Sequence, residues 1–248
     1  MKLIIIFITI IIISIIYIPK KKPKNILLAL PTIDRDVDIA PHIYNNLNNS
    51  VNHFLLKYPN VNVDIIVACR YEDVKSVNFW EDKVMILKQD NYRILKRHNF
   101  NQLAKTFNNI REYAKTNDYD ALMILESDIV MKKSTLTDLH EGLSNYDVMC
   151  CYFDIPWEKK PVVVKKYPIP HIINPENYNY NNILSIVGTG TGCVLINKKA
   201  LNVKFDVKTY KGVTGQDVGF YYNLYKNGYS VGMVTKYKLE HLYNRLKT

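Results

Sequence analysis

The pattern of apolar and polar residues predicts strands that alternate with helices over most of this chain. Continuous apolar runs of about four to eight residues are typical of strands buried on both faces of a parallel sheet. Such runs occur at residues 25–30, 61–68, 84–87, 121–125, 148–153, 193–196 and 230–234. The strand–helix alternation therefore predicts one α/β domain with a mostly parallel central sheet and flanking helices.

Helical spacing predicts helices between these strands. One carries Ile43, Leu47, Val51 and Phe54 on one face, and a second covers about residues 99–117. Another follows Ser134, which is a typical N-cap residue, and a later one begins within residues 214–220 and ends at Gly228. Residues 154–183 show no periodicity, so we expect a long loop there.

The apolar pattern of the N-terminal residues predicts a membrane anchor. Residues 3–18 are almost wholly apolar, close to the lower limit for a membrane-spanning helix, and no small residues typical of a signal-peptide cleavage site follow them. We therefore expect an uncleaved single-pass anchor with its basic flank in residues 1–24, and a separate domain in residues 25–248. The lysines at 20, 21, 22 and 24 favour a cytoplasmic location for that domain.

Composition narrows the range of partners. The net charge of +10 suits an anionic partner, such as a nucleoside diphosphate or an acidic membrane face. No Lys/Arg stripe with interleaved aromatic residues is present in the sequence, so a nucleic-acid partner is not expected. The four cysteines lie in apolar runs without metal-site spacing and are expected to be buried thiols.

The most informative chemical feature is the pair of acids at the end of the apolar run 121–125. Glu126 and Asp128 are two residues apart and are expected to project the same way, so their charges converge. A divalent cation with hard oxygen ligands, Mn²⁺ or Mg²⁺, would relieve this repulsion. The alternative is that both acids are solvated turn residues.

Other candidate residues follow in the second half of the chain. Trp157 and Tyr178 are candidates for stacking on a sugar ring or for ordinary packing. The glycine-rich turn at residues 188–192 lacks the Gly-Lys-Ser/Thr of a phosphate loop and leads into a strand, so it permits either close approach to a ligand or a bulge. Asp217 is expected in the first turn of a helix, and His241 stands near the C-terminus.

Taken in order, these features resemble the GT-A glycosyltransferases, specifically the family 2-like nucleotide-sugar transferases, over about residues 25–241. The resemblance implies a Rossmann-like GT-A catalytic domain, with a nucleotide-sugar donor and a glycan, protein or lipid acceptor. It implies metal binding by Glu126, Asp128 and His241, and an acidic base at Asp217. This chain departs from the family pattern at Glu126, where Asp is usual, and at Gln216, where Glu is usual.

The resemblance also implies the substrate-facing residues. On the donor side we expect Pro31, Thr32, Asp34, Arg70, Arg97, Asn99 and Glu126. On the acceptor side we expect Trp157, Gly190, Thr191, Gly192 and Gln216.

The expected reaction is an inverting transfer in which Asp217 deprotonates an acceptor hydroxyl. Retention of configuration would need a different geometry. Two other functions are compatible with the same residues: a nucleotidyl or phosphoryl transferase, and an inactive binding protein on the same fold.

Overall fold

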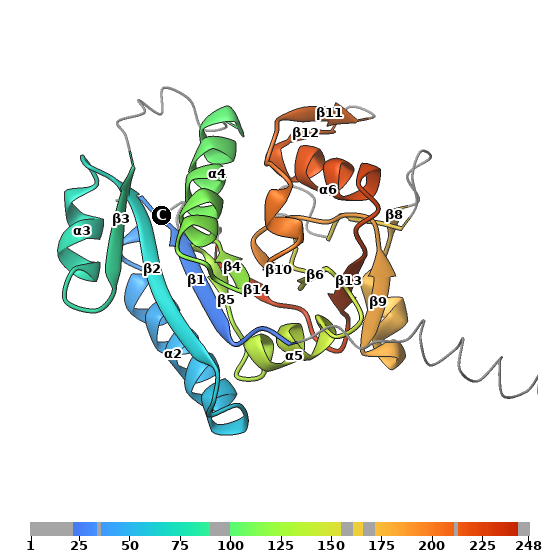
Figure 1. Ribbon diagram of the computed structural model, residues 1–248, viewed down its shortest axis with the longest axis horizontal. Coiled ribbons are helices and arrows are strands. Elements are labelled where there is room, and N and C mark those ends of the chain that lie inside the picture. The colour runs from blue at the N-terminus through green and yellow to red at the C-terminus, as the bar shows by residue number, and fades with distance from the viewer. Residues whose placement is uncertain are drawn as a thin grey trace, which may run out of the picture.

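The computed structural model describes residues 22–33, 36–89, 100–154, 161–165, 172–210 and 213–242. Within them an eight-stranded sheet has the order β3-β2-β1-β4-β10-β6-β13-β9 (Figure 1). In chain order its strands are β1 (Asn25–Pro31), β2 (Asn62–Arg70), β3 (Met85–Gln89), β4 (Ala121–Leu125), β6 (Val148–Cys150), β9 (Ile183–Ile186), β10 (Cys193–Asn197) and β13 (Val231–Val234). The predicted α/β class is therefore confirmed.

Most strands of this sheet run in one direction. β1 is parallel to β2 and β4, and β2 is parallel to β3. β10 is antiparallel to both β4 and β6, so β6 runs with β4, and β13 is parallel to β6. β9 is antiparallel to β13. The mostly parallel sheet was predicted; the reversed direction of β10 was not, because an apolar run does not encode the direction of its strand.

Helices cover both faces of the sheet (Figure 1). α2 (Ala40–Lys57), α3 (Val74–Trp80) and α5 (Thr135–Gly142) pack on one face, and α4 (Phe100–Thr116) and α6 (Gln216–Lys226) on the other. In β1, the alternate residues Ile26 and Leu28 face the α2 side, and Leu27 and Ala29 face the α4 side. All four are fully buried, which is why this strand reads as a continuous apolar run.

Two local predictions are corrected by the structure, and one helix was not predicted. The run 148–153 leaves the sheet after Cys150, and Phe153 makes only an isolated bridge to Leu239. The segment 154–183 is not wholly a loop, since it contains β7 (Val163–Val164), β8 (Ile172–Ile173) and the 3₁₀ segment η2 (Pro175–Asn181). Helix α3 was not predicted at all; its seven residues are too few for a clear helical period.

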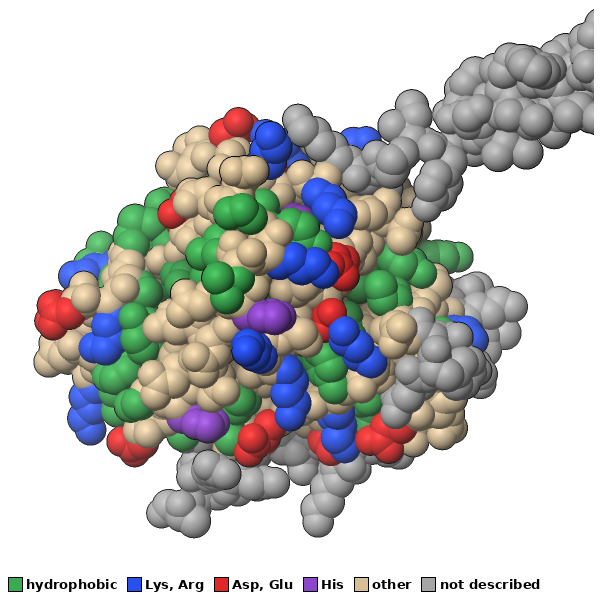
Figure 2. Space-filling view, turned by 90° about the horizontal axis from the view of Figure 1, so that it is seen from below, with side chains coloured by type: hydrophobic (Ala, Val, Ile, Leu, Met, Phe, Trp, Pro, Cys, Tyr) green, Lys and Arg blue, Asp and Glu red, His purple; other side chains and the backbone are tan. Residues whose placement is uncertain are grey.

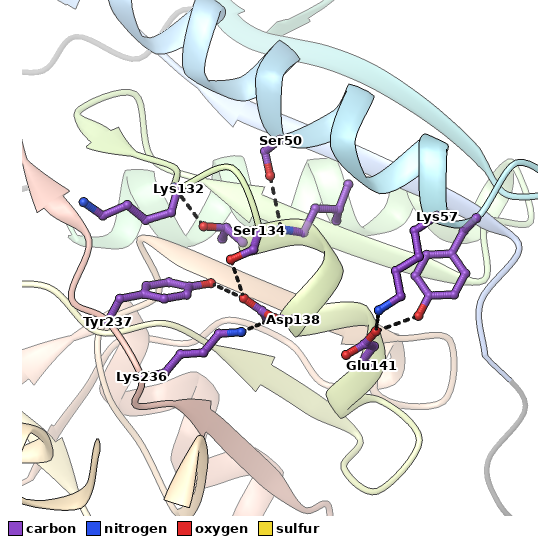
Figure 3. A network of polar contacts seen from close by, with 11 residues as sticks. Ser50, Lys57, Lys132, Ser134, Asp138, Glu141, Lys236 and Tyr237 are labelled. Carbon is purple, nitrogen blue, oxygen red and sulfur yellow. Dashed lines mark hydrogen bonds and ion pairs between the residues drawn. The ribbon is translucent and has the colours of Figure 1, made fainter. Parts of the chain in front are cut away.

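Ser134 precedes α5 as predicted, but its side chain does not cap the helix. Its hydroxyl donates instead to Asp138, which also accepts from Lys236 and Tyr237 (Figure 3). On the same helix, Glu141 accepts from Lys57 and Tyr58 at the end of α2. These contacts join α5 both to α2 and to the C-terminal segment.

Residues 23 and 24 belong structurally to the domain. The Pro23 carbonyl lies 3.0 Å from Nε2 of the buried His140, and the Lys24 N–H donates to Asp120. The predicted anchor at residues 3–18 lies outside the described residues. In the part of the chain that the structure describes, no helix has the length and apolarity to cross a membrane.

Charged side chains of both signs lie together on the surface. Figure 2 shows the face seen from below in Figure 1, where Lys and Arg side chains lie beside Asp and Glu side chains. Among the described residues, Lys57–Glu141 and Lys198–Asp118 are exposed pairs of opposite charge. Exposed pairs contribute only about 0–1 kcal/mol each, so these contacts add little to stability.

Candidate active site

The candidate site lies at the carboxyl ends of the parallel strands, where open α/β sheets bind ligands. Pro31 ends β1, and the N–H of the next residue, Thr32, donates to Ala68 of β2. β4 ends at Leu125, directly before Glu126-Ser127-Asp128. The predicted residues at the ends of these three strands therefore share one edge of the sheet.

The backbone fixes the Glu126–Asp128 turn on both sides. The Glu126 N–H donates to the Gly192 carbonyl at 2.8 Å, and the Ile129 N–H donates to the Glu126 carbonyl at 3.1 Å. The short strand β5 (Ile129–Val130) follows immediately. The glycine-rich turn and the acidic turn are therefore joined directly.

His241 reaches this turn from the C-terminus. It lies in β14 (Glu240–His241), which pairs antiparallel with β5. The His241 Nε2 atom lies 3.2 Å from Asp128 Oδ2, and Nδ1 lies 2.9 Å from the Asp154 carbonyl oxygen. Because a carbonyl only accepts, Nδ1 carries a hydrogen, and Nε2 is the nitrogen that faces Asp128.

Contacts along the C-terminal segment hold His241 in place. Lys238 pairs with Asp154 and Glu176, at 2.9 and 3.1 Å. The Leu239 N–H donates to the Tyr152 carbonyl at 3.0 Å, and the Leu242 N–H donates to the Asp128 carbonyl at 2.8 Å. The β5–β14 pairing could not be predicted, because a two-residue strand has no periodicity.

The carboxylates of the site influence one another. Burial and the charge of Asp128 raise the pKa of Glu126 to about 8, with smaller upward contributions from Asp217 and Asp36. Burial lowers the pKa of His241, but the hydrogen bond and charge of Asp128 outweigh burial and leave that pKa above its ordinary value. The contribution of Asp217 to the pKa of Glu126 indicates that the start of α6 lies near the acidic turn.

Asp217 lies in the first turn of α6, as predicted. Burial raises the pKa of Asp217, while hydrogen bonds from backbone N–H groups oppose that rise. The neighbouring Gln216 is 6% exposed, and its Oε1 atom has no hydrogen-bond partner among the described residues. A buried amide oxygen without a partner is costly and marks a place where a ligand hydroxyl could donate.

The glycine-rich turn makes room for an aromatic ring of the protein. A Cβ on Gly192 would lie 2.7 Å from the Phe153 ring, and one on Gly190 would lie 3.0 Å from it. Phe153 in turn packs edge-on against the His241 ring, with 5.4 Å between the ring centroids. Thr191, between the two glycines, is 2% exposed, and its hydroxyl has no partner among the described residues.

Asp36 is a residue of this site that the sequence analysis missed. It is 4% exposed and accepts a hydrogen bond from the Ser127 hydroxyl at 2.5 Å. Its position shortly after β1, at the same sheet edge as Glu126, was the available signal. The loop after β1 holds three aspartates, at positions 34, 36 and 38, and the sequence alone does not tell which of them lies against Ser127.

The structure describes only some of the remaining predicted site residues. Arg70 ends β2, where its guanidinium pairs with Asp73. Tyr178 lies under the ammonium group of Lys165, 4.9 Å from the ring centroid. Four predicted positions lie outside the described residues: Asp34, Arg97, Asn99 and Trp157.

The donor set limits which metal could bind. Among the described residues, no group of three or more His, Cys, Asp or Glu side chains is arranged to hold a metal ion. Asp128 and His241 form a pair of one carboxylate and one imidazole. A carboxylate suits Mg²⁺ or Mn²⁺ and an imidazole suits transition metals, so this mixed pair fits Mn²⁺ better than Mg²⁺.

Comparisons with known proteins give only distant structural likenesses. No protein-family model and no curated protein sequence matches the chain. A197 from STIV is similar at 15% identity and a TM-score of 0.46, over 88% of this chain and 85% of that chain. The inositol-1-phosphate CTP transferase from T. maritima is similar at 10% identity and a TM-score of 0.48, over 86% of each chain.

A putative nucleotide-diphospho-sugar transferase from Desulfovibrio desulfuricans G20 is similar at 9% identity and a TM-score of 0.44, over 85% of this chain and 79% of that chain. Likenesses at this level carry no argument about what this chain binds or catalyses. The family 2-like resemblance stays a prediction, and functional inference rests on the site itself.

Proposed function

We propose that this chain is a metal-dependent glycosyltransferase that moves a sugar from a nucleoside-diphosphate sugar to an acceptor hydroxyl. The observation that carries the proposal is the contact between Asp128 and His241, 113 positions apart, in the acidic turn that follows β4. A structural role alone would not explain why several carboxylates gather at the ligand-binding edge of the sheet.

In this proposal Asp128 and His241 would hold a divalent ion together with the donor diphosphate. When bound, the ion would neutralise the charge that develops on the departing diphosphate. The hydrogen bond from Nδ1 of His241 to the Asp154 carbonyl orients the ring, as is usual for histidines that bind metals. Mn²⁺ is the proposed metal because of the mixed nitrogen and oxygen donors.

Asp217 is the proposed base. Its carboxylate takes the proton of the acceptor hydroxyl as that oxygen attacks the anomeric carbon, and the bond from that carbon to the diphosphate breaks. Attack from the face opposite the diphosphate inverts the configuration. A raised pKa suits this role, because it makes the carboxylate a stronger base than an exposed aspartate.

Gln216 and Thr191 are proposed to contact the acceptor. Each has a buried oxygen without a partner among the described residues, and each adjoins a residue of the site. A polyhydroxylated acceptor can satisfy both, since every sugar hydroxyl donates and accepts. Gln216 in place of an acid also lowers the negative charge that an acceptor would meet, which suits a neutral or anionic glycan.

The test is an assay of product release by the full-length chain in detergent. With Mn²⁺ and a panel of nucleotide sugars, we expect slow release of a nucleoside diphosphate from one or a few donors, faster with the correct acceptor and abolished by chelator. A nucleotidyl transferase would instead release pyrophosphate from a nucleoside triphosphate and a sugar phosphate. That result, or no turnover with any donor under conditions where the chain is folded, would refute the proposal.

A further inference from the structure

Helix α6 begins without an N-cap side chain. The residue before it, Gly215, is extended, with φ −179° and ψ 166°. The first N–H groups of a helix need acceptors, and an N-cap Ser, Thr, Asp or Asn usually supplies one. Here the acceptor comes from inside the helix, because Oδ1 of Asp217 accepts the N–H of Val218 at 2.8 Å.

The Asp217 carboxylate occupies the space of a side chain on residue 215. A Cβ placed on Gly215 would overlap Oδ1 of Asp217, well inside van der Waals contact. The backbone itself does not require glycine, because every residue adopts a φ close to 180°. The requirement for glycine at this position is therefore one of space and concerns only the carboxylate.

The helix cannot move away to relieve such an overlap. Gly219, one turn further on, lies so close to the Asp206 carbonyl that a Cβ there would overlap the oxygen. Phe220 stacks on Phe205 with 4.1 Å between the ring centroids. The Asn223 side chain donates to the Lys204 carbonyl at 3.3 Å and to the Asp206 carboxylate at 3.0 Å.

A side chain on residue 215 must therefore displace the Asp217 carboxylate. The carboxylate is the end of a flexible side chain and can rotate about χ1 and χ2, whereas the helix is held along its length. Such a rotation leaves the fold intact and moves the oxygen atoms out of their present position.

We propose that Gly215 is a positioning residue for Asp217. Because Gly215 has no side chain, the Asp217 carboxylate can lie where a Cβ of residue 215 would be. The inference rests on the proposed function for what the carboxylate does, and on the geometry alone for where it lies. Residue 215 therefore supplies no side-chain N-cap, and the first turn of α6 holds the Asp217 carboxylate in the position proposed for the base.

The test replaces Gly215 by Ser in the full-length chain. Serine is a favourable N-cap, so the melting temperature should equal or exceed that of the wild type. Turnover should fall by roughly tenfold or more with an unchanged KM for the donor, because a misplaced base slows the chemical step alone.

Gly228→Ala, at the other end of the same helix, is the matched control. Gly228 has a φ of +73° and no atom within 4 Å of the position of a Cβ, so alanine there strains the backbone without a clash. The melting temperature should fall, and turnover per folded molecule should stay as in the wild type. Comparing the two variants therefore distinguishes a loss of stability from a displacement of the Asp217 carboxylate.

A second readout does not depend on the reaction. The ¹³C resonance of the Asp217 carboxyl, assigned through Asp217→Asn, should shift and titrate differently in Gly215→Ser than in the wild type. A wild-type chain that transfers no sugar would refute the proposed function, yet this resonance would still decide the inference. An unchanged resonance and titration, or wild-type turnover, in Gly215→Ser would overturn it.

Discussion

Replacing Asp217 by Asn removes one negative charge from the start of α6 and keeps the shape of the side chain. The remaining carbonyl oxygen of Asn can still accept the N–H of Val218, which now bonds to Oδ1 at 2.8 Å. We therefore expect the fold and the affinity for the donor to be retained. Turnover should fall by about a hundredfold or more, or about 2.7 kcal/mol in the activation barrier, as for loss of a positioned base.

The stability change can be bounded from two opposing effects. The charge of Asp217 interacts favourably with the N-terminus of the helix, by about 0.3–1 kcal/mol. Burial of the same carboxylate is unfavourable, as its raised pKa shows. The two effects oppose each other, so Asp217→Asn should change the free energy of unfolding by about 1 kcal/mol or less in either direction.

The raised pKa of Asp217 predicts how the stability change caused by Asp217→Asn depends on pH. A carboxyl group whose pKa is raised on folding contributes stability that is present below its unfolded pKa and lost as pH rises through its folded pKa. The wild type should therefore lose stability between acid and neutral pH, whereas the Asn variant should not. The stability of Asp217→Asn relative to the wild type should thus be higher at neutral pH than at acid pH. Wild-type turnover should fall as pH drops through the raised pKa of Asp217, because only the carboxylate acts as a base.

The assay combines melting temperature, donor affinity and turnover on the variant and on a control. Asp206→Asn is that control: Asp206 contacts the same helix through Asn223, is exposed, and has no part in the proposed chemistry. It should keep near-normal turnover. If Asp217→Asn also turns over at nearly the wild-type rate, Asp217 is not the base and the inverting assignment loses its support.

Two further predictions concern packing and the N-terminus. Gly192→Ala forces a Cβ to 2.7 Å from the Phe153 ring and should lower the melting temperature, at a cost of about 1–3 kcal/mol; an unchanged melting curve would contradict the close packing. The full chain should sediment with membranes, and removing residues 1–21 should release a folded domain, whereas removing residues 1–24 should yield a less stable one because the Pro23 contact is lost. Equal melting temperatures for the two truncations would argue against a structural role for Pro23.

The sequence predicted those parts of the fold that have their own local signal. β1 and β4 are continuous apolar runs, and α2 and α4 have a clear helical period, so all four lie close to the predicted positions. Asp217 in the first turn of α6 and the left-handed Gly228 after it also follow from local rules.

Features that depend on contacts between distant segments were not predictable. The β5–β14 pairing places His241 against Asp128, although each strand has only two residues. The packing of Phe153 against Gly192 and the hydrogen bond between Asp36 and Ser127 likewise join segments far apart in the chain. A periodicity describes one element and says nothing about which distant element will lie against it.

The central claim is that Asp128 and His241 bind a metal–diphosphate unit, and the melting temperature of the full-length chain tests it most directly. A nucleoside diphosphate with Mn²⁺ at about 100 times its dissociation constant should stabilise the fold by about 2.7 kcal/mol, or roughly 5–10 °C. Asp128→Asn should lose this shift, and Asp118→Asn, at an exposed ion pair with Lys198, should keep it. An equal shift with nucleotide in excess chelator, or an undiminished shift in Asp128→Asn, would contradict the claim.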